Sequence, residues 1–457
     1  MSKFRAAFLL SVVSLFLFPS AVIGLTVPEV IRVGLESGYS GVDNLDILNK
    51  DISHGYGTEA GRGQYGVLTA KTGFSVRVSD GRAVLYDGPA VVAVLKPGDN
   101  IAGVSAPINL GDRRYRGAVE FMIVGSKITA VNCLTIEEYL YSVVPSEMPQ
   151  SWHIEALKAQ VVASRSYSMT RLSAHRKEGY HFCDRVHCQS YLGVGNEAES
   201  TTTAVNATLG VLAYYDGAPI NAVYSSSNGG HSSASEDVWT ETVPYLRAVD
   251  DVFEVSGRRW KREFTLAQVE SLLNDDIGTV TKVYIGKTAQ SGHVLELVIE
   301  GTSGSKILAK EGIRAFFSPL PGGALESTNF VIQGTSPSVP IFTVSIFGVG
   351  GTAQIPLSYT YVLPAGKESV RTPSVIAPVV SPDFFPVHVI GKDTHTIYGL
   401  NPGMAPGNSS NSGAVVFSGS GWGHGAGMSQ YGAKDMAEAG FNYVQILKHY
   451  YTGIEVG

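Results

Sequence analysis

The chain has 457 residues, a length that predicts two or three domains. Hydrophobic residues make up 44% and charged residues 16% of the sequence, which is enough apolar material for a sizeable core and argues against disorder. The 34 Lys and Arg residues against 40 Asp and Glu residues give a net charge of −6, which excludes the basic footprint of a nucleic-acid-binding protein.

The first residues have the pattern of an export signal. Lys3 and Arg5 precede an apolar run from Ala6 to Phe18, and small residues follow it. This arrangement predicts a secretory signal peptide over residues 1–24, with an uncleaved N-terminal anchor as the alternative. We therefore expect the protein in the periplasm or on the cell-wall side of the cytoplasmic membrane. No later stretch is apolar over about 18 residues, so only the uncleaved signal would hold it to a membrane.

Residues 25–115 read as a β-rich N-terminal region. Short β-branched runs are bounded by Gly, Asp or Pro, and Asp80-Gly81 between two runs predicts a hairpin. The following part, 116–330, begins with a short helical turn over Glu137–Leu140. The clearest helix then runs from Ser151, a potential cap, to about Leu172, because its apolar residues recur at helical spacing.

The rest of the chain mixes both kinds of element. We expect strands around the turn at Asp216-Gly217, and two short helices (264–272 and 307–316) beside a strand pair (280–284 and 294–299). Residues 331–412 read as a Pro/Gly-rich insertion or accessory β region, with a surface excursion over 363–412. Residues 413–457 combine a Gly-rich loop with two short helices, the second started by a capping box of Asn442 and Gln445. The predicted fold class is α+β.

Glu147 is the first candidate for chemistry. It stands between the apolar residues Val144 and Met148, close to Trp152. A carboxyl in such surroundings is poorly solvated, which raises its pKa and keeps it protonated near neutral pH, as a general acid requires. The alternative is an ordinary exposed loop glutamate.

A cluster of soft ligands follows the helix. Cys183, His187 and Cys188 have the spacing of a Zn²⁺ site, with His181 or, as second choice, His175 as the fourth ligand. Four protein ligands would make the site structural. The alternative is a disulfide between Cys183 and Cys188, which export would permit. The third cysteine, Cys133, reads as a buried apolar residue.

Two polar, glycine-containing segments are candidates for substrate binding. The first runs from Ser225 to His231, and its hydroxyls and amide suit contacts to a sugar; a Ser227-His231-Asp237 triad is discounted because the G-x-S-x-G pattern is missing. The second, Gly421 to Gly432, fits neither a dinucleotide fold nor a P-loop. Its glycines allow close approach to a ligand or to another segment, and a tight structural turn is the alternative. The predicted substrate-binding residues are Ser226, Ser227, Gly229, Gly230, His424, Ser429 and Gln430.

Five blocks of the sequence, taken together, resemble one family. They are Glu137 to Pro149, Glu155 to Tyr167, Cys183 to Gln189, Ser225 to Trp239 with Tyr245 to Asp250, and Gly423 to Gly432. In this order they are similar to the signature of the sporulation stage II protein D family (SpoIID/LytB). The chain departs from the usual pattern in Ser164, where alanine is common, and in a segment, 255–412, that is longer than the family core requires.

The resemblance implies a lytic transglycosylase of bacterial peptidoglycan. Such an enzyme cuts the β-1,4 bond between N-acetylmuramic acid and N-acetylglucosamine in glycan strands stripped of stem peptides. The family's catalytic acid falls on Glu147, and its zinc site falls on Cys183, His187 and Cys188 with a histidine. Glu147 would protonate the glycosidic oxygen and then deprotonate the sugar's own C6 hydroxyl, which gives a 1,6-anhydro end.

Two other functions compete with this one. Some relatives modify cell-wall amidases, so the chain could bind glycan and stimulate an amidase without cutting. A zinc hydrolase is the weaker alternative, because it needs an open metal position. The expected partners are peptidoglycan glycan strands, with a cell-wall amidase or divisome proteins as candidates, and no nucleic acid.

Overall fold

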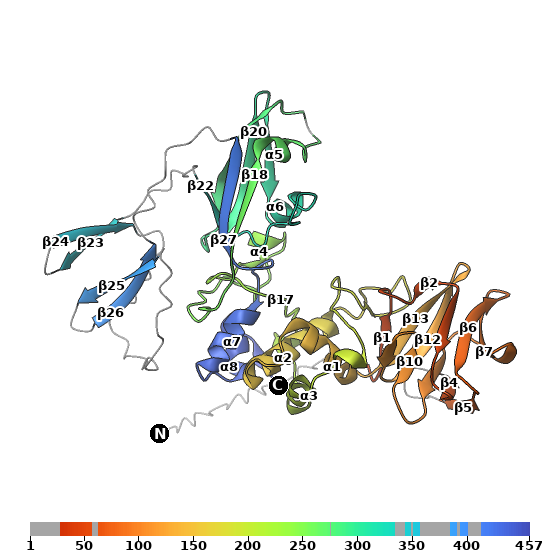
Figure 1. Ribbon diagram of the computed structural model, residues 1–457. Coiled ribbons are helices and arrows are strands. Elements are labelled where there is room, and N and C mark those ends of the chain that lie inside the picture. Colours follow the sequence, from red (N-terminus) through yellow and green to blue (C-terminus); the bar gives the residue numbers. More distant parts are fainter. Residues whose placement is uncertain are drawn as a thin grey trace, which may run out of the picture.

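The computed structural model describes residues 28–56, 63–274, 276–333 and 413–457. It also gives the backbone of four strands: β23 (Thr343–Gly348), β24 (Gly351–Pro356), β25 (Phe384–Ile390) and β26 (Thr394–Leu400). The predicted signal at 1–24, and all of 363–412 except β25 and β26, lie outside the described residues. Figure 1 shows a helical centre between an N-terminal β region and a second β-rich module.

The N-terminal region consists of two sheets, as its β-branched runs predict. An eight-stranded sheet has the order β14 (Phe182–Cys183), β1 (Ile31–Gly34), β13 (Lys127–Leu134), β12 (Ala118–Val124), β9 (Asp99–Gly103), β4 (Asp51–Tyr56) and β5 (Gly63–Thr69), with β2 (Ser40–Val42) beside β13. A six-stranded sheet has the order β11 (Arg113–Tyr115), β10 (Ile108–Leu110), β3 (Asn44–Ile47), β6 (Phe74–Ser79), β7 (Arg82–Asp87) and β8 (Ala90–Leu95). The predicted hairpin at Asp80-Gly81 joins β6 to β7, and both turn residues have the positive φ that such a turn requires.

A group of helices shares one hydrophobic core with the N-terminal sheets. They are α1 (Ile136–Glu147), α2 (Ile154–Thr170), α3 (Glu199–Ala207), α7 (Gln430–Glu438) and α8 (Tyr443–Tyr450). One continuous cluster of buried apolar residues runs from the N-terminal strands through α1 and α2 to α8. The capping box of Asn442 and Gln445 at the start of α8 is confirmed. A 3₁₀ turn, η1 (Val194–Asn196), lies before α3.

Two helix boundaries differ from the sequence-based expectation. α1 continues from the predicted turn at Glu137–Leu140 to Glu147, although Pro145 lies in its last turn. The apolar residues of this stretch are buried against the core, and this burial offsets the cost of the proline, which removes a backbone hydrogen bond and crowds the carbonyl four residues before it. α2 begins at Ile154 with His153 as its cap, not at Ser151, because the His153 ring accepts a hydrogen bond from the Glu155 amide (3.3 Å).

The second module has a separate hydrophobic core. It contains a sheet of β18 (Arg259–Thr265), β27 (Ala414–Ser420) and β22 (Phe330–Gln333), a second sheet of β19 (Val280–Thr288), β20 (Val294–Gly301) and β21 (Ser305–Ala309), and the short helices α5 (Leu266–Glu270) and α6 (Glu311–Phe316). The predicted strand pair is confirmed as β19 and β20. The predicted helix over 307–316 is only partly correct, because residues 307–309 belong to β21 and the helix starts at Glu311.

Short β-strand pairs connect the segment around residues 213–233 with the C-terminal segment of the chain. β17 (Tyr224–Ser225) lies parallel to β28 (Met428–Ser429), and bridges link Ser227 to Trp422 and Ser233 to Ala426. β15 (Ala213–Tyr215) pairs with β16 (Ala218–Pro219) through the expected turn and with β29 (Glu455–Val456). α4 (Ser235–Val238) follows the serine-rich segment. The predicted α+β fold, with a β-rich N-terminal part and a Gly-rich loop before two C-terminal helices, is therefore correct.

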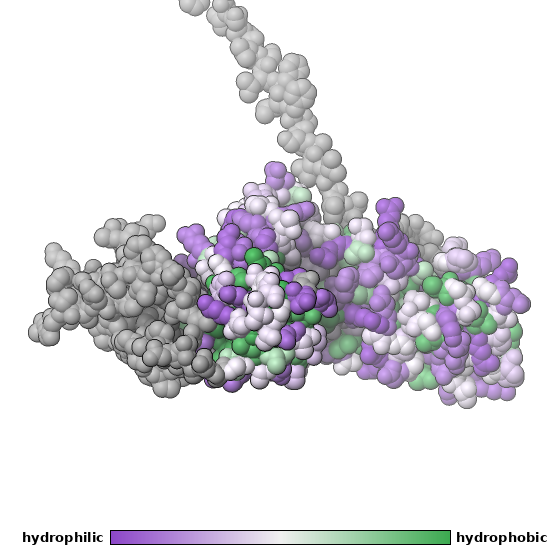
Figure 2. All heavy atoms as spheres, turned by 90° about the horizontal axis from the view of Figure 1, so that it is seen from above, coloured by the Kyte–Doolittle hydropathy of each residue, from purple (hydrophilic) through white to green (hydrophobic). Residues whose placement is uncertain are grey.

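The surface carries no large uniform patch on the face seen in Figure 2. Hydrophilic and hydrophobic residues alternate there in small areas over the second module and the N-terminal sheets. Within the described part of the chain, the helices are too short or too polar to cross a membrane.

Candidate functional site

Glu147 is the last residue of α1, and its carboxyl lies in a largely buried position among neutral polar groups. The Tyr224 hydroxyl, the Ser190 backbone amide and the Gln430 side-chain amide approach it. Burial raises the pKa of this carboxyl above its ordinary value, and the three donors oppose that rise because they favour the charged form. The net shift of the Glu147 pKa is upward, so the effect of desolvation is larger than that of the three donors.

Buried side chains connect two of these donors to each other. The Gln430 amide donates to Gln160 (3.2 Å), and the Gln160 amide donates to Ser164 (2.9 Å). The Ser164 hydroxyl contacts the Tyr224 hydroxyl at 3.4 Å. With Glu147, these residues form a closed polar ring whose members come from α1, α2, β17 and the start of α7.

Gln189 fixes the Tyr224 hydroxyl from the other side. Its amide donates to that hydroxyl (3.0 Å), and its own carbonyl accepts a hydrogen bond from Ser168 in α2 (2.8 Å). Burial, followed by the nearby Glu147 charge, raises the pKa of Tyr224 well above its ordinary value. Tyr224 therefore stays protonated and remains a hydrogen-bond donor to Glu147.

The predicted metal ligands come together on one side of the core. Ligand atoms of His175, Cys183, His187 and Cys188 all lie within 4.8 Å of one another. The His187 Nδ1 atom lies 3.3 Å from His175 Nε2, 3.5 Å from Cys188 Sγ and 3.8 Å from Cys183 Sγ. Four N and S ligands around one Zn²⁺ ion are about 3.3–3.8 Å apart, given bonds of about 2.0–2.3 Å. The donor set and its spacing thus fit a closed tetrahedral site.

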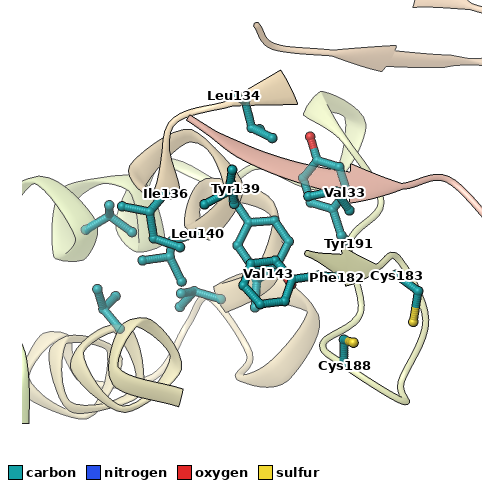
Figure 3. Packing of buried hydrophobic residues seen from close by; sticks show 14 of the residues in the cluster. Val33, Leu134, Ile136, Tyr139, Leu140, Val143, Phe182, Cys183, Cys188 and Tyr191 are labelled. Carbon is teal, nitrogen blue, oxygen red and sulfur yellow. The ribbon is translucent and has the colours of Figure 1, made fainter. Parts of the chain in front are cut away.

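The fourth residue of this group is His175, not His181. The His181 ring instead accepts a hydrogen bond from the Arg32 backbone amide (3.1 Å), because its segment runs beside β1. Of the two histidines that the sequence offers as the fourth ligand, His175 is the one that lies with the other three residues. Cys183 and Cys188 are both free thiols, so the structure contains no disulfide between them. Figure 3 shows both cysteines beside the packed rings of Phe182 and Tyr139.

The serine-rich segment is held by a buried carboxylate that sequence reasoning missed. Glu254 accepts hydrogen bonds from the hydroxyls of Ser227 and Ser429 and from the backbone amides of Asn228 (3.1 Å) and Gly229 (3.2 Å). Ser429 also caps α7. The structure therefore places Ser227, Gly229 and Ser429 in a hydrogen-bonded network around Glu254.

The other predicted binding residues contact several different parts of the protein. Gln430 reaches Glu147, and the Ser226 carbonyl accepts a hydrogen bond from the Tyr431 amide (3.0 Å). The Gly230 amide donates to the Asn228 side chain (2.9 Å). His424 stacks against Trp239, with ring centroids 5.1 Å apart. Of the predicted set, Gln430 is the one whose side chain is shown to approach the carboxyl.

The Gly-rich loop approaches the protein itself closely. A Cβ atom at Gly423 would lie 2.6 Å from the Ser225 side chain, and one at Gly427 would collide with the Val223 carbonyl. Both glycines have positive φ, so a side chain there would also strain the backbone. These glycines seat the loop against β17, and in this way they place Gln430 beside Glu147.

The discounted triad is not assembled. Ser227 contacts Glu254, whereas the His231 ring forms an ion pair with Asp250 (2.8 Å). Glu155 is also occupied: burial raises its pKa, but Lys158 (2.7 Å) and the Tyr443 amide (2.9 Å) lower it by more. It serves as a link between α2 and α8.

Comparison with known proteins agrees with this architecture. Residues 124–215 match the family model described as Stage II sporulation protein, and residues 251–351 match a domain of unknown function (DUF8618). The chain is 32% identical over 350 residues to the amidase enhancer of Bacillus subtilis (strain 168), an alignment that covers 76% of this chain but 44% of that protein. The chain thus spans less than half the length of this relative.

Two further relatives are covered more fully. Stage II sporulation protein D of Bacillus amyloliquefaciens is 25% identical over 72% of this chain and 75% of its own length. An uncharacterized protein of Brachyspira hyodysenteriae is 26% identical over 75% of this chain and 72% of its own length. The family model, the amidase enhancer and the sporulation proteins D together support the SpoIID family, with its cell-wall-related role, for this chain.

Proposed function

We propose that the protein is an exported lytic transglycosylase that cuts peptidoglycan glycan strands, with Glu147 as its acid and base. The observation that carries the proposal is the Glu147 carboxyl, whose pKa is raised by burial and which faces neutral donors. A carboxyl of this kind is protonated at the pH where a solvent-exposed glutamate is already charged. It can therefore deliver a proton to a leaving glycosidic oxygen.

The reaction then needs one carboxyl and no water. Glu147 protonates the glycosidic oxygen while the bond to the muramic C1 breaks and an oxocarbenium-like state develops. The Glu147 carboxylate left behind accepts the proton of the sugar's C6 hydroxyl, whose oxygen attacks C1. Tyr224 and Gln430 donate toward the carboxylate and so stabilise it between the two proton transfers. The products are a free 4-hydroxyl and a 1,6-anhydro end.

The nearby cysteine and histidine cluster supports a structural zinc ion in this proposal. His175, Cys183, His187 and Cys188 would hold it, and four protein ligands leave no open position for catalysis. When bound, the ion would cross-link the 175–188 segment. That segment ends one residue before Gln189, which positions Tyr224.

Product analysis tests the proposal. The purified protein alone should convert peptide-free glycan strands into fragments with 1,6-anhydro-muramic ends, each lighter by one water than a hydrolytic product. Mass spectrometry after digestion in ¹⁸O-labelled water should detect no incorporated label. Labelled reducing ends would instead mean a hydrolase, with a second carboxylate to be sought among Glu155, Glu236 and Asp237.

A second candidate function rests on a relative's name. The amidase enhancer of Bacillus subtilis matches 76% of this chain, which favours a protein that binds glycan and stimulates a cell-wall amidase. Under this alternative the protein alone should give no new glycan ends, yet should raise the rate of a purified amidase on whole peptidoglycan. Measuring both rates with one preparation separates the two functions.

A further inference from the structure

A strip of stacked side chains runs along the surface beside Glu147. We call Trp152, Tyr431, Arg258 and Trp422 the aromatic strip. The rings of Trp152 and Tyr431 are 5.1 Å apart in an edge-to-face arrangement. The Arg258 guanidinium carbon lies 5.8 Å from the Tyr431 ring and 4.9 Å from the Trp422 ring. The strip is therefore continuous from the loop after α1 to the Gly-rich loop.

One end of the strip adjoins the candidate catalytic carboxyl. Tyr431 directly follows Gln430, whose amide approaches Glu147, and Trp152 lies in the loop that leaves the end of α1. The other end is open to solvent, because Trp422 exposes 43% of its surface and Arg258 is also exposed. A chain-like ligand that places one bond at Glu147 could thus extend along the strip.

The strip is held in place by the buried network around Glu254. The Arg258 amide donates to the Ser227 hydroxyl (3.3 Å), and the Arg258 carbonyl accepts a hydrogen bond from the Gly421 amide (2.7 Å). Ser227 in turn donates to Glu254. Arg258 comes from the segment that matches the domain of unknown function, so this segment contributes directly to the surface beside the carboxyl.

The chemistry of the strip specifies its ligand. Flat aromatic faces pack against the apolar faces of sugar rings, and aromatic residues that adjoin one another on a surface indicate a binding site more strongly than a single exposed ring does. Arg258 has a cation–π contact with each neighbouring ring, but no carboxylate partner for it occurs among the described residues. The strip therefore combines ring faces with a cation that is available to an anion.

We propose that the aromatic strip binds the glycan strand beyond the cleaved bond, and that Arg258 pairs with the free lactyl carboxylate of a muramic acid residue. This proposal rests on the proposed function for its ligand class. In intact peptidoglycan the stem peptide converts that carboxyl into a neutral amide. Removal of the peptide leaves a carboxylate, the group that a guanidinium binds best. Arg258 would therefore favour strands without stem peptides.

The test compares two ligands that differ in the lactyl group that carries this carboxylate. Binding of the full-length protein to peptide-free glycan fragments and to chito-oligosaccharides of the same length is measured by calorimetry, in the Glu147→Gln background so that nothing is cut. Arg258→Gln should weaken binding to the muramic glycan about five- to tenfold and leave chito-oligosaccharide binding almost unchanged. Added salt should reduce this difference. Trp422→Ala should weaken both ligands, and Trp422→Phe should restore much of the loss.

Matched controls come from the N-terminal sheets. Arg77→Gln removes an arginine that also stacks on a tyrosine, Tyr86, at 5.0 Å, and Tyr56→Ala removes an aromatic residue with the same 43% exposure as Trp422. Neither control should change binding. An equal loss for both ligands in Arg258→Gln, or no loss in either, would overturn the proposal. If the wild-type protein binds muramic glycan but yields no anhydro ends, the proposed transglycosylase activity is wrong, whereas the proposal that the aromatic strip binds glycan remains supported.

Discussion

At the scale of single residues, the site is governed by the balance at Glu147 between burial and hydrogen-bond donors. Burial raises the pKa of the carboxyl, whereas Tyr224, the Ser190 amide and Gln430 lower it. A general acid needs the first effect to hold its proton, and the donors stabilise the carboxylate that remains after the proton has been transferred. The polar ring provides both without a neighbouring charge.

Replacing Glu147 tests its role directly. Glu147→Gln keeps the size and most hydrogen-bonding capacity of the side chain but cannot transfer a proton. We expect the fold, the melting temperature and glycan binding to be preserved, while the rate of glycan cleavage falls by a factor of about 10² or more. Release of anhydro ends measures the rate. A variant that retains most of the wild-type rate would show that Glu147 is not the acid.

The pH dependence of cleavage follows from the same balance. Because Glu147 must start protonated, kcat/KM should fall as pH rises through its raised pKa, with a midpoint above the ordinary 4.5. Tyr224→Phe removes a donor that lowers this pKa, so the midpoint should move to higher pH. The pH–rate profiles of both proteins provide the measurement. Tyr214→Phe, a change in β15 remote from the ring, should leave the profile unchanged, and a shift to lower pH in Tyr224→Phe would contradict the assignment.

At the scale of elements, the segment from 175 to 188 is the clearest case of a loop that depends on its ligands. It contains little regular structure apart from the two residues of β14, and it contributes all four residues of the metal group. Metal binding to such a segment is coupled to folding, because a preformed site is absent in the unfolded chain. We therefore expect the 175–188 segment to adopt this structure only when the ion is bound.

Replacing each histidine decides the ligand set. We expect purified protein to carry about one zinc per chain, and His175→Ala and Cys183→Ser to lose it and to lower the melting temperature. His181→Ala should keep the metal, because its ring contacts the Arg32 amide instead. Elemental analysis and thermal unfolding give the two readouts. Zinc loss in His181→Ala but not in His175→Ala would reverse the assignment, and a metal-free protein with a Cys183–Cys188 disulfide would rule out the site.

At the scale of the whole molecule, two hydrophobic cores are joined through a buried histidine. His293 of the second module is 2% exposed and contacts the His231 backbone carbonyl (3.0 Å) and the Thr328 hydroxyl (3.0 Å). A carbonyl oxygen only accepts, so His293 Nε2 carries the proton and Nδ1 accepts from Thr328. A Cβ atom at Gly425 would lie 2.8 Å from this ring, so the Gly-rich loop also packs on the junction.

This histidine makes stability depend on pH. Burial lowers the pKa of His293 from 6.5 to about 4, so the folded protein resists a proton that the unfolded chain accepts. The stability it confers is complete above pH 6.5 and is lost as pH falls from 6.5 toward 4, by roughly 3 kcal/mol in all. His293→Gln should flatten this part of the profile of unfolding free energy against pH.

His293 is not the sole contributor to this pH dependence. Burial also lowers the pKa of His424 to about 4, so His424 contributes to the loss of stability over the same pH range. The slope should therefore fall in His293→Gln without disappearing. Denaturant unfolding at several pH values between 4 and 7 gives the measurement. An unchanged slope would mean that the junction opens to water before the histidine is protonated.

Local sequence patterns determined much of the architecture. The Asp80-Gly81 hairpin and the capping box at Asn442 were predictable because each depends on residues adjacent in the chain. The raised pKa of Glu147 was predictable from its apolar neighbours, and the cluster of possible metal ligands from the spacing of Cys183, His187 and Cys188. Such features need no knowledge of distant contacts.

Only the tertiary structure decided which distant groups meet. Tyr224 carries no local signal of its contact with Glu147, and neither does Gln189 of its contact with Tyr224. Gln430, which also approaches Glu147, lies 283 residues further along the chain. The choice of His175 over His181 likewise depended on how the loop folds back beside β1. The contacts of Ser227 and Ser429 with Glu254 were not predictable either, because Glu254 is distant from both serines in sequence. A polar residue reveals its type in the sequence, but the free energy of burying it, and hence its role, depends on the partners that folding brings to it.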